Sequence, residues 1–194
     1  VANSTTALSV DGTVKLDGNY PVGNYNVALG NTALDDGSLS GNYNTALGAA
    51  SFGNLTSGTA NLAVGAYAGQ NHTTGSYNVF VGEEAAVGNT TGSSNTAVGR
   101  TALYSNTTSN YNTAMGRQAA YSNTTGEQNL ALGGLAFYTN TTGSYNVALG
   151  MESLKANTTA SNNTAVGFQA GYANTTGSVT AFGQKALFNN TTGA

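Results

Sequence analysis

A five-residue phrase returns along this chain at a fixed interval, and that interval constrains the fold more than any other feature. Nine copies begin with asparagine: Asn26, Asn44, Asn61, Asn78, Asn95, Asn112, Asn129, Asn146 and Asn163. The first step is 18 residues and the other seven are 17, while a tenth copy at 179–183 lacks the Asn and comes one residue early. A strict period of this length predicts a repeat architecture in which each repeat packs against its neighbours.

The composition favours an ordered array and excludes several functional classes. Disordered chains combine high net charge with few apolar residues, whereas this chain has a net charge of −3 and 39% apolar residues in strict phase. Five basic residues cannot supply the positive surface that nucleic-acid binding needs. No apolar run approaches the ~18 residues of a membrane-spanning helix. The sequence also shows no secretory signal pattern in residues 1–20.

Each position of the repeat, numbered from the Asn, predicts one local structure. Positions 1–4 are rich in β-branched residues and predict a short strand, which ends at position 5 because all ten copies have Gly there. Bulky residues at positions 9 and 10, such as Leu103 and Tyr104, predict a second short strand. Asn-Thr-Thr runs such as 106–108 predict a polar corner, because Asn tolerates the left-handed conformation.

These positions together predict an all-β, parallel β-solenoid of about ten 17-residue coils. Seventeen residues cannot fold alone, so the coils must stack, and ~4.8 Å per coil gives an array of about 50 Å. A short helix in each repeat fits less well, because Gly and β-branched residues disfavour helix. Stacking also predicts an amide ladder at the corner, formed by Asn106, Asn123, Asn140, Asn157 and Asn174.

The strand predicted at positions 1–4 of each repeat is apolar on both faces, and this feature predicts an assembly of several chains. A strand with two apolar faces is usually covered on both sides. We expect the large residues at position 4 to form the coil core: Leu47, Val64, Val81, Val98, Met115, Leu132, Leu149 and Val166. We expect the small residues at position 3 to face neighbouring chains: Ala46, Ala63, Ala97, Ala114, Ala131, Ala148 and Ala165. The opposite assignment of the two faces stays open, because the pattern alone does not distinguish them.

The chain divides into two parts. Residues 25–194 form the repeat array, and residues 1–24 do not fit the repeat. Asp11-Gly12 is typical of a tight turn between two short strands, and Pro21 breaks any ladder that precedes the first coil. We therefore expect an N-terminal β cap or joint over 1–24. The array ends in mid-repeat, from which we expect a longer chain or a partly ordered one.

The phrase Asn-x-Ala-(Val/Leu)-Gly-x-x-(Ala/Ser) resembles the head repeat of trimeric autotransporter adhesins. The combination of Asn-Thr-Ala-x-Gly with Asn-Thr-Thr-Gly is even more similar to repeats of bacteriophage tail-fibre proteins. The resemblance covers about residues 25–194 and implies a left-handed parallel β-roll in a side-by-side homotrimer. It implies a virion location outside the cell, contacts with other fibre or tail proteins through residues 1–24, and contact with host-cell glycans. The repeat is longer than is usual for the adhesin heads.

Few residues suggest chemistry. His72 stands where other coils have the corner Asn, and we expect an exposed turn variant without a metal role. The acidic pairs 35–36 and 83–84 are expected to be surface charge, because adjacent carboxylates do not face each other across a substrate bond. The Asn-Thr-Thr runs match N-glycosylation acceptors, for which corner geometry is the better explanation. We therefore expect no enzyme and no cofactor.

Recurring tyrosines and threonines leave binding functions open. Tyrosines precede the Asn in several coils, as at Tyr77, and they suit either ring packing or sugar binding. Paired threonines such as 107–108 suggest an ice-binding face, although adjacent residues point to opposite sides. The main hypothesis is a tail-fibre shaft that holds a host-recognition tip away from the virion. A bacterial surface adhesin head is the alternative, and an ice-binding protein is a third hypothesis.

Overall fold

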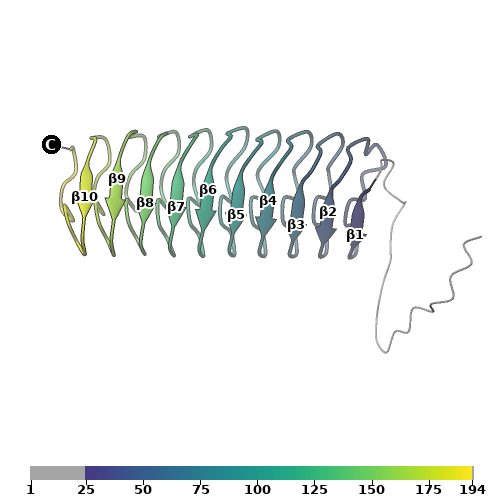
Figure 1. Cartoon of the computed structure of the whole chain (residues 1–194), viewed down its shortest axis with the longest axis horizontal. Coiled ribbons are helices and arrows are strands. Elements are labelled where there is room, and N and C mark those ends of the chain that lie inside the picture. Colours follow the sequence, from purple (N-terminus) through teal and green to yellow (C-terminus); the bar gives the residue numbers. More distant parts are fainter. Residues whose placement is uncertain (1–24, 194) are drawn as a thin grey trace, which may run out of the picture.

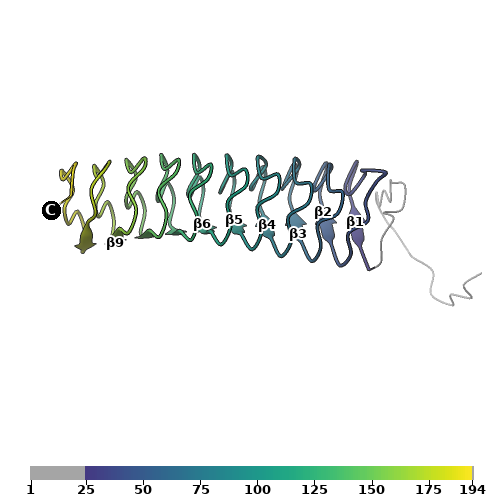
Figure 2. The ribbon, with the colours of Figure 1, turned by 90° about the horizontal axis from the view of Figure 1, so that it is seen from above.

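In a computed structural model, the chain forms a straight rod of stacked coils (Figures 1 and 2). The structure describes residues 25–193, and the cap predicted for residues 1–24 lies outside them. The described residues form a parallel β-solenoid of about nine turns and contain no helix. The prediction of an all-β parallel solenoid is therefore confirmed.

Each coil contributes one strand of three residues to a single ten-stranded parallel sheet with the strands in chain order. The strands are Val27–Leu29 (β1), Thr45–Leu47 (β2), Leu62–Val64 (β3), Val79–Val81 (β4), Thr96–Val98 (β5), Thr113–Met115 (β6), Leu130–Leu132 (β7), Val147–Leu149 (β8), Thr164–Val166 (β9) and Thr180–Phe182 (β10). Equivalent positions pair throughout, as Ala97 does with Ala114. The repeat period in the sequence therefore becomes the register of the sheet.

The strand is bonded to both neighbouring coils. The Thr96 amide donates to the Asn112 carbonyl oxygen at 2.8 Å, and the Gly99 amide donates to the Val81 carbonyl oxygen at 2.7 Å. A three-residue strand is marginal alone, but the same bonds recur in coil after coil. The rod is therefore held by a continuous ladder along its axis.

The predicted second strand is wrong, because positions 6–11 form two successive turns. Ala102 donates its amide to the Gly99 carbonyl and Asn106 donates to the Leu103 carbonyl. Positions 7 and 9 both have left-handed backbone, with φ of 53° at Thr101 and 50° at Leu103. This conformation is uncommon for residues with a side chain. Bonds between coils offset its cost, as in the Leu103 amide donating to the Ala119 carbonyl at 3.0 Å.

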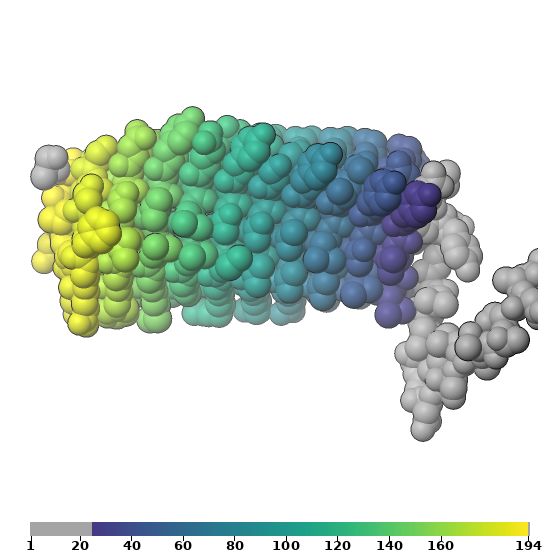
Figure 3. Space-filling view, in the orientation of Figure 1, coloured from purple at the N-terminus to yellow at the C-terminus, as the bar shows by residue number. Residues whose placement is uncertain are grey.

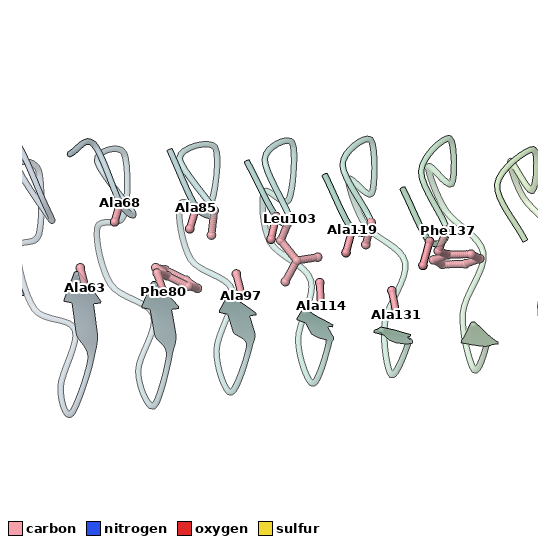
Figure 4. Close-up of a cluster of buried hydrophobic side chains, with 14 of the residues drawn as sticks. Ala63, Ala68, Phe80, Ala85, Ala97, Leu103, Ala114, Ala119, Ala131 and Phe137 are labelled. Carbon is pink, nitrogen blue, oxygen red and sulfur yellow. The ribbon is translucent and has the colours of Figure 1, made fainter. Parts of the chain in front are cut away.

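The assignment of the strand faces is also corrected. The position-3 alanines point into the coil, where they are at most 1% exposed: Ala46, Ala63, Ala97, Ala114, Ala131, Ala148 and Ala165. They face the small position-8 residues of the opposite wall, such as Ala68 and Ala119 (Figure 4). At most levels the core between these two walls therefore has small side chains on both sides. Alanine is therefore the core residue and does not face a neighbouring chain.

The residues predicted as coil core lie on the outside instead. Seven of them are half-buried and Met115 is exposed: Leu47, Val64, Val81, Val98, Met115, Leu132, Leu149 and Val166. Alternation along the strand requires this result, because positions 2 and 4 point away from position 3. Larger core residues enter mainly from the turns, as with Phe52, Leu103 and Phe137.

The glycine at position 5 is required by close packing between coils. Gly99 has φ of +132°, and a Cβ added there would lie 2.5 Å from the Gly116 carbonyl oxygen. The same contact recurs down the column, so a methyl group at one level would collide with the next backbone. The invariant glycine thus sets how closely successive coils stack.

Candidate functional site

The asparagine at position 1 closes each coil and starts the next. The Asn112 side chain is 1% exposed. Its Nδ2 donates to the Gly126 carbonyl oxygen at 2.9 Å, and its Oδ1 accepts from the Asn129 amide at 3.0 Å. Both bonds fall where the chain passes from one coil to the following one. The position-1 asparagines are therefore structural, since both ends of the amide are satisfied inside the rod.

The corner asparagines at position 12 form part of the predicted amide ladder. Nδ2 of Asn106 donates to Oδ1 of Asn89 at 2.8 Å, and the links from Asn123 to Asn106 and from Asn140 to Asn123 measure 3.1 and 2.7 Å. The ladder changes at Asn157, whose amide instead exchanges two bonds with the backbone of residue 160.

The last corner asparagine departs further from the ladder. Asn174 donates to the Gly177 carbonyl at 2.7 Å and to Oδ1 of Asn163 at 3.3 Å. Its own Oδ1 is buried without a hydrogen-bond partner. The corner column is thus in register throughout, but its direct amide links run from Asn89 to Asn140.

The burial of the corner column bears on N-glycosylation. The acceptor asparagines Asn89, Asn106, Asn123, Asn140 and Asn174 are all 0% exposed. Their side chains point into the coil and are held by the bonds described above. A folded coil therefore cannot present them to a transferase, which supports corner geometry as the reason for these residues.

His72 is buried, and the prediction of an exposed turn variant is wrong. Its ring is 0% exposed and lies 5.5 Å from the Phe52 ring and 5.8 Å from the Phe80 ring, between ring centroids. Nδ1 lies 3.0 Å from Nδ2 of Asn89, and Nε2 lies 2.9 Å from the Gly75 carbonyl oxygen. These contacts fit a neutral ring that accepts at Nδ1 and donates at Nε2. Burial lowers the pKa of His72 to about 4.

One outer surface of the sheet is largely apolar and is formed by the side chains of positions 2 and 4: position 4 is apolar in every coil, while position 2 is Val or Leu in five coils and Thr in the other five. Its exposed members include Val27, Leu29, Met115 and Phe182. These side chains recur at every coil, and the space-filling view in Figure 3 shows the coils stacked as successive bands along the rod. We call this surface the outer apolar face. An apolar surface that follows a whole rod is a common sign of an interaction site.

A tyrosine column runs beside this face at position 17. Tyr25, Tyr43, Tyr77, Tyr111 and Tyr145 are all exposed, at 56–75%. Between Tyr43 and Tyr77 the column has Ala60, and a hollow of about 470 Å³ opens there. Leu62 and Val79 from position 2 also line this hollow, so the tyrosine column and the outer apolar face are continuous.

A second set of aromatic residues stacks at position 10. The rings of Tyr104 and Tyr121 lie 4.9 Å apart and those of Tyr121 and Tyr138 lie 5.3 Å apart, nearly parallel in both pairs. Partial burial and the neighbouring phenols raise the pKa of Tyr121. Lys155 continues the column and lies 5.5 Å above the Tyr172 ring. These tyrosines pack along the rod edge.

The two threonines of each corner have different environments. At position 13 the hydroxyl donates to the carbonyl of the next coil, as Thr107 does to Thr124 at 3.1 Å. At position 14 the side chain is exposed, and within residues 25–193 its hydroxyl has no protein partner. This threonine column consists of Thr74, Thr91, Thr108, Thr125, Thr142, Thr159, Thr176 and Thr192, preceded by Ser57.

Charged residues form isolated surface pairs. Glu83 accepts from Nε of Arg100 at 3.0 Å, with both side chains more than half exposed. Hydrogen bonds from Ser38 lower the pKa of Asp36. In the described part of the chain, no three His, Asp or Glu side chains gather as metal ligands, and no helix is long and apolar enough to cross a membrane.

Comparison with protein-family models, with curated proteins and with solved structures finds no match to this chain. The repeated columns are therefore the basis of any functional argument. Two columns of asparagine close and align the coils, while three outward surfaces remain: the outer apolar face, the tyrosine column and the threonine column.

Proposed function

We propose that this chain is a structural rod segment that associates side by side with copies of itself, as a parallel homotrimer. The outer apolar face carries this proposal. Within residues 25–193 its side chains have no partner element covering them, yet they follow the sheet over all ten strands. A strand buried on one face and apolar on the other is typical of a sheet that is covered on both sides.

The spacing of the face favours a second copy as its partner. Its apolar columns repeat with the strand spacing of ~4.8 Å. Only a surface with the same pitch can meet these columns at every coil, and another copy of the rod has that pitch. The face covers roughly 600 Å², from ten strands and a width of about four residues. Three such faces would bury about 1,800 Å² in the trimer, or about 600 Å² for each pair of chains, which is a small interface.

The proposed biological role is the shaft of a bacteriophage tail fibre or a related appendage, located in the virion. The rod suits this role because backbone hydrogen bonds link each coil to the next along the axis and buried amides close the coils. Such a shaft would hold a host-recognition tip away from the particle. The chain's own chemistry supports no catalytic role, and its function in this proposal is mechanical.

Light scattering on the purified chain tests the assembly. We expect three times the monomer mass of 19.4 kDa. The variant Val98→Asp places a charge in the middle of the outer apolar face and should give monomers, because an unpaired charge is costly in a dry interface. Thr108→Asp adds the same charge to the threonine column and should leave the trimer intact. A soluble, folded wild-type monomer would refute the proposal.

Ice binding is a second candidate, and the threonine column is the observation that favours it. Its exposed residues provide a straight row of free hydroxyl and methyl groups at the strand spacing. The neighbouring position-13 threonines do not compete for this surface, because their hydroxyls bond within the rod. Thermal hysteresis measures this activity, and Thr108→Asp together with Thr125→Asp should abolish it. A wild-type chain without thermal hysteresis would exclude the candidate.

A further inference from the structure

The outer apolar face carries little information about axial alignment. Position 4 is apolar in every coil, and position 2 is Thr in five coils and Val or Leu in the other five, so neighbouring levels differ in side-chain type but none of them has a charge. A copy displaced by one coil would still meet uncharged side chains at every level, at the loss of one coil of contact in ten. Repetitive strands of this kind specify register weakly. A defined trimer therefore needs another feature that distinguishes neighbouring coils.

The tyrosine column differs from the other columns because it alternates. From the second coil onward its members are Tyr43, Ala60, Tyr77, Ser94, Tyr111, Gln128, Tyr145 and Asn162. The four tyrosines are 56–69% exposed, so a ring projects at every second coil. Where Ala60 replaces the ring, the 470 Å³ hollow opens between its neighbours. The column thus has a period of two coils, or about 10 Å.

The hollow connects this alternation to the proposed interface. Leu62 and Val79 of the outer apolar face line it together with the rings of Tyr43 and Tyr77. The lining has no charged side chain. A copy that covers the outer apolar face therefore also meets the alternating rings and the hollow at Ala60.

We infer that the alternating tyrosine column sets the axial register of self-association, with a second copy of this chain as its partner. This inference rests on the proposed trimer. If one copy is displaced by one coil, each of its tyrosine rings lies at the height of a residue without a ring in the other copy. The packing therefore changes at every coil. A displacement of two coils restores the pattern but uncovers two coils in ten. Equal height is then the one arrangement that keeps both the packing and the full contact area.

Cysteine cross-linking measures this register, since the chain has no cysteine of its own. Single cysteines replace Thr96, Thr113 or Leu130, which are half-buried position-2 residues of three successive coils. Tagged Thr96→Cys copies are assembled with copies that carry Thr96→Cys, Thr113→Cys or Leu130→Cys. The disulfide yields of these three mixtures report displacements of zero, one and two coils, respectively. For wild-type columns we expect one maximum at zero displacement and at least fivefold less product at one coil.

Two variants make the column uniform. In the first, Tyr43, Tyr77, Tyr111 and Tyr145 all become serine. In the second, Ala60, Ser94, Gln128 and Asn162 all become tyrosine. Both should raise the one-coil product to within about twofold of the zero-displacement product. The matched control replaces Tyr104, Tyr121, Tyr138 and Tyr172 with serine, which also removes four tyrosines but away from the face, and it should keep the wild-type profile.

Light scattering on each protein separates the possible failures. A monomeric wild type would refute the trimer, and the inference with it. A trimer whose profile is unchanged in both uniform variants would overturn the register inference alone. A control variant whose one-coil disulfide product rises as much as that of the uniform variants would also overturn the register inference alone. If the serine variant is monomeric while the control is trimeric, the column supplies affinity rather than register, and the inference is also overturned.

Discussion

The ring of Phe80 occupies space that Gly69 leaves open in the preceding coil. A Cβ added to Gly69 would lie 2.7 Å from Cδ2 of Phe80 and 2.6 Å from Cε1 of Phe52. The two phenylalanine rings lie 5.8 Å apart between centroids, and both are fully buried. Phe80 is the one position-3 residue of the ten that is not alanine. A large residue on one wall is therefore matched by the absence of a side chain on the other.

This relationship predicts that Gly69→Ala is destabilising. The new methyl group has no room between two rings in a close-packed core, and overpacking of this kind typically costs ~1–3 kcal/mol. Gly171→Ala is the matched control, because Gly171 has the same repeat position and almost the same φ, 59° against 57°. Its nearest neighbour is a Leu154 methyl group at 3.0 Å, which can move. Urea denaturation should show a larger decrease in the free energy of unfolding for Gly69→Ala than for Gly171→Ala.

The same pair should be coupled in a double-mutant cycle. Phe80→Ala alone leaves a cavity and should cost about 3–5 kcal/mol. In a Gly69→Ala background the cost should be smaller, because the smaller residue at 80 makes room for the new methyl group. Additive losses would mean that the ring does not depend on the glycine.

Much of the architecture was predictable from the sequence because it follows from periodicity. The 17-residue step determines the pairing of Ala97 with Ala114, and glycine at position 5 marks a close contact between coils. Which face of the strand is inside was not predictable in the same way. Both faces carry apolar residues, and only the structure shows which one is inside: Ala97 is fully buried, whereas Val98 is half-buried on the outer surface.

The turn backbone and the buried polar residues were missed for other reasons. Leu103 has a left-handed backbone that no residue preference indicates, because bonds to the adjacent coil override the local preference. His72 was expected at the surface because histidine is polar and stands in a turn. The position of His72 in the same column as Asn89 could have indicated its burial, because a side chain that stacks on a buried amide is buried as well.

His72 predicts a loss of stability in acid. Its pKa is about 4 in the folded chain and near 6.5 when unfolded. Because the folded-state pKa is depressed, the unfolded state takes up the proton first as the pH falls from about 6.5. The free energy of unfolding should decrease through this window and lose about 3 kcal/mol by pH 4. Urea midpoints at pH 7.5, 6, 5 and 4 measure the decrease.

The variant His72→Asn provides the comparison. Asparagine occupies this position in the following coils, and its amide can continue the ladder to Asn89. Carboxylates such as Glu152, whose pKa Lys155 lowers, contribute equally to both proteins. The difference between variant and wild type therefore isolates the histidine. A constant difference across the four pH values would contradict the burial of a neutral ring.

Asn112→Ala should be among the most destabilising polar substitutions. It leaves the Asn129 amide without its partner inside the rod, and it removes one of the two bonds to the Gly126 carbonyl, which keeps the bond from Nδ2 of Asn123. An unsatisfied buried group costs ~1–3 kcal/mol, so we expect a loss of about 1–3 kcal/mol. Thr108→Ala, at an exposed position of the threonine column, should be within about 0.5 kcal/mol of wild type. A similar effect for both variants, measured by urea denaturation, would show that the amide does not close the coil.

Gly99→Ala tests whether backbone contact, rather than φ alone, makes position 5 glycine. The added Cβ would meet the Gly116 carbonyl oxygen at 2.5 Å, in a backbone conformation that L-residues rarely adopt. Collision and strain together should cost roughly 3 kcal/mol or more. Gly183→Ala has φ of +114° but no atom within 4 Å, so only the strain applies and about 1–3 kcal/mol is expected. Gly134→Ala, with its nearest neighbour at 4.0 Å, should be nearly neutral. The midpoint of thermal unfolding should be lowest for Gly99→Ala, intermediate for Gly183→Ala and highest for Gly134→Ala. Equal losses of stability for Gly99→Ala and Gly183→Ala would mean that backbone strain alone requires the glycine.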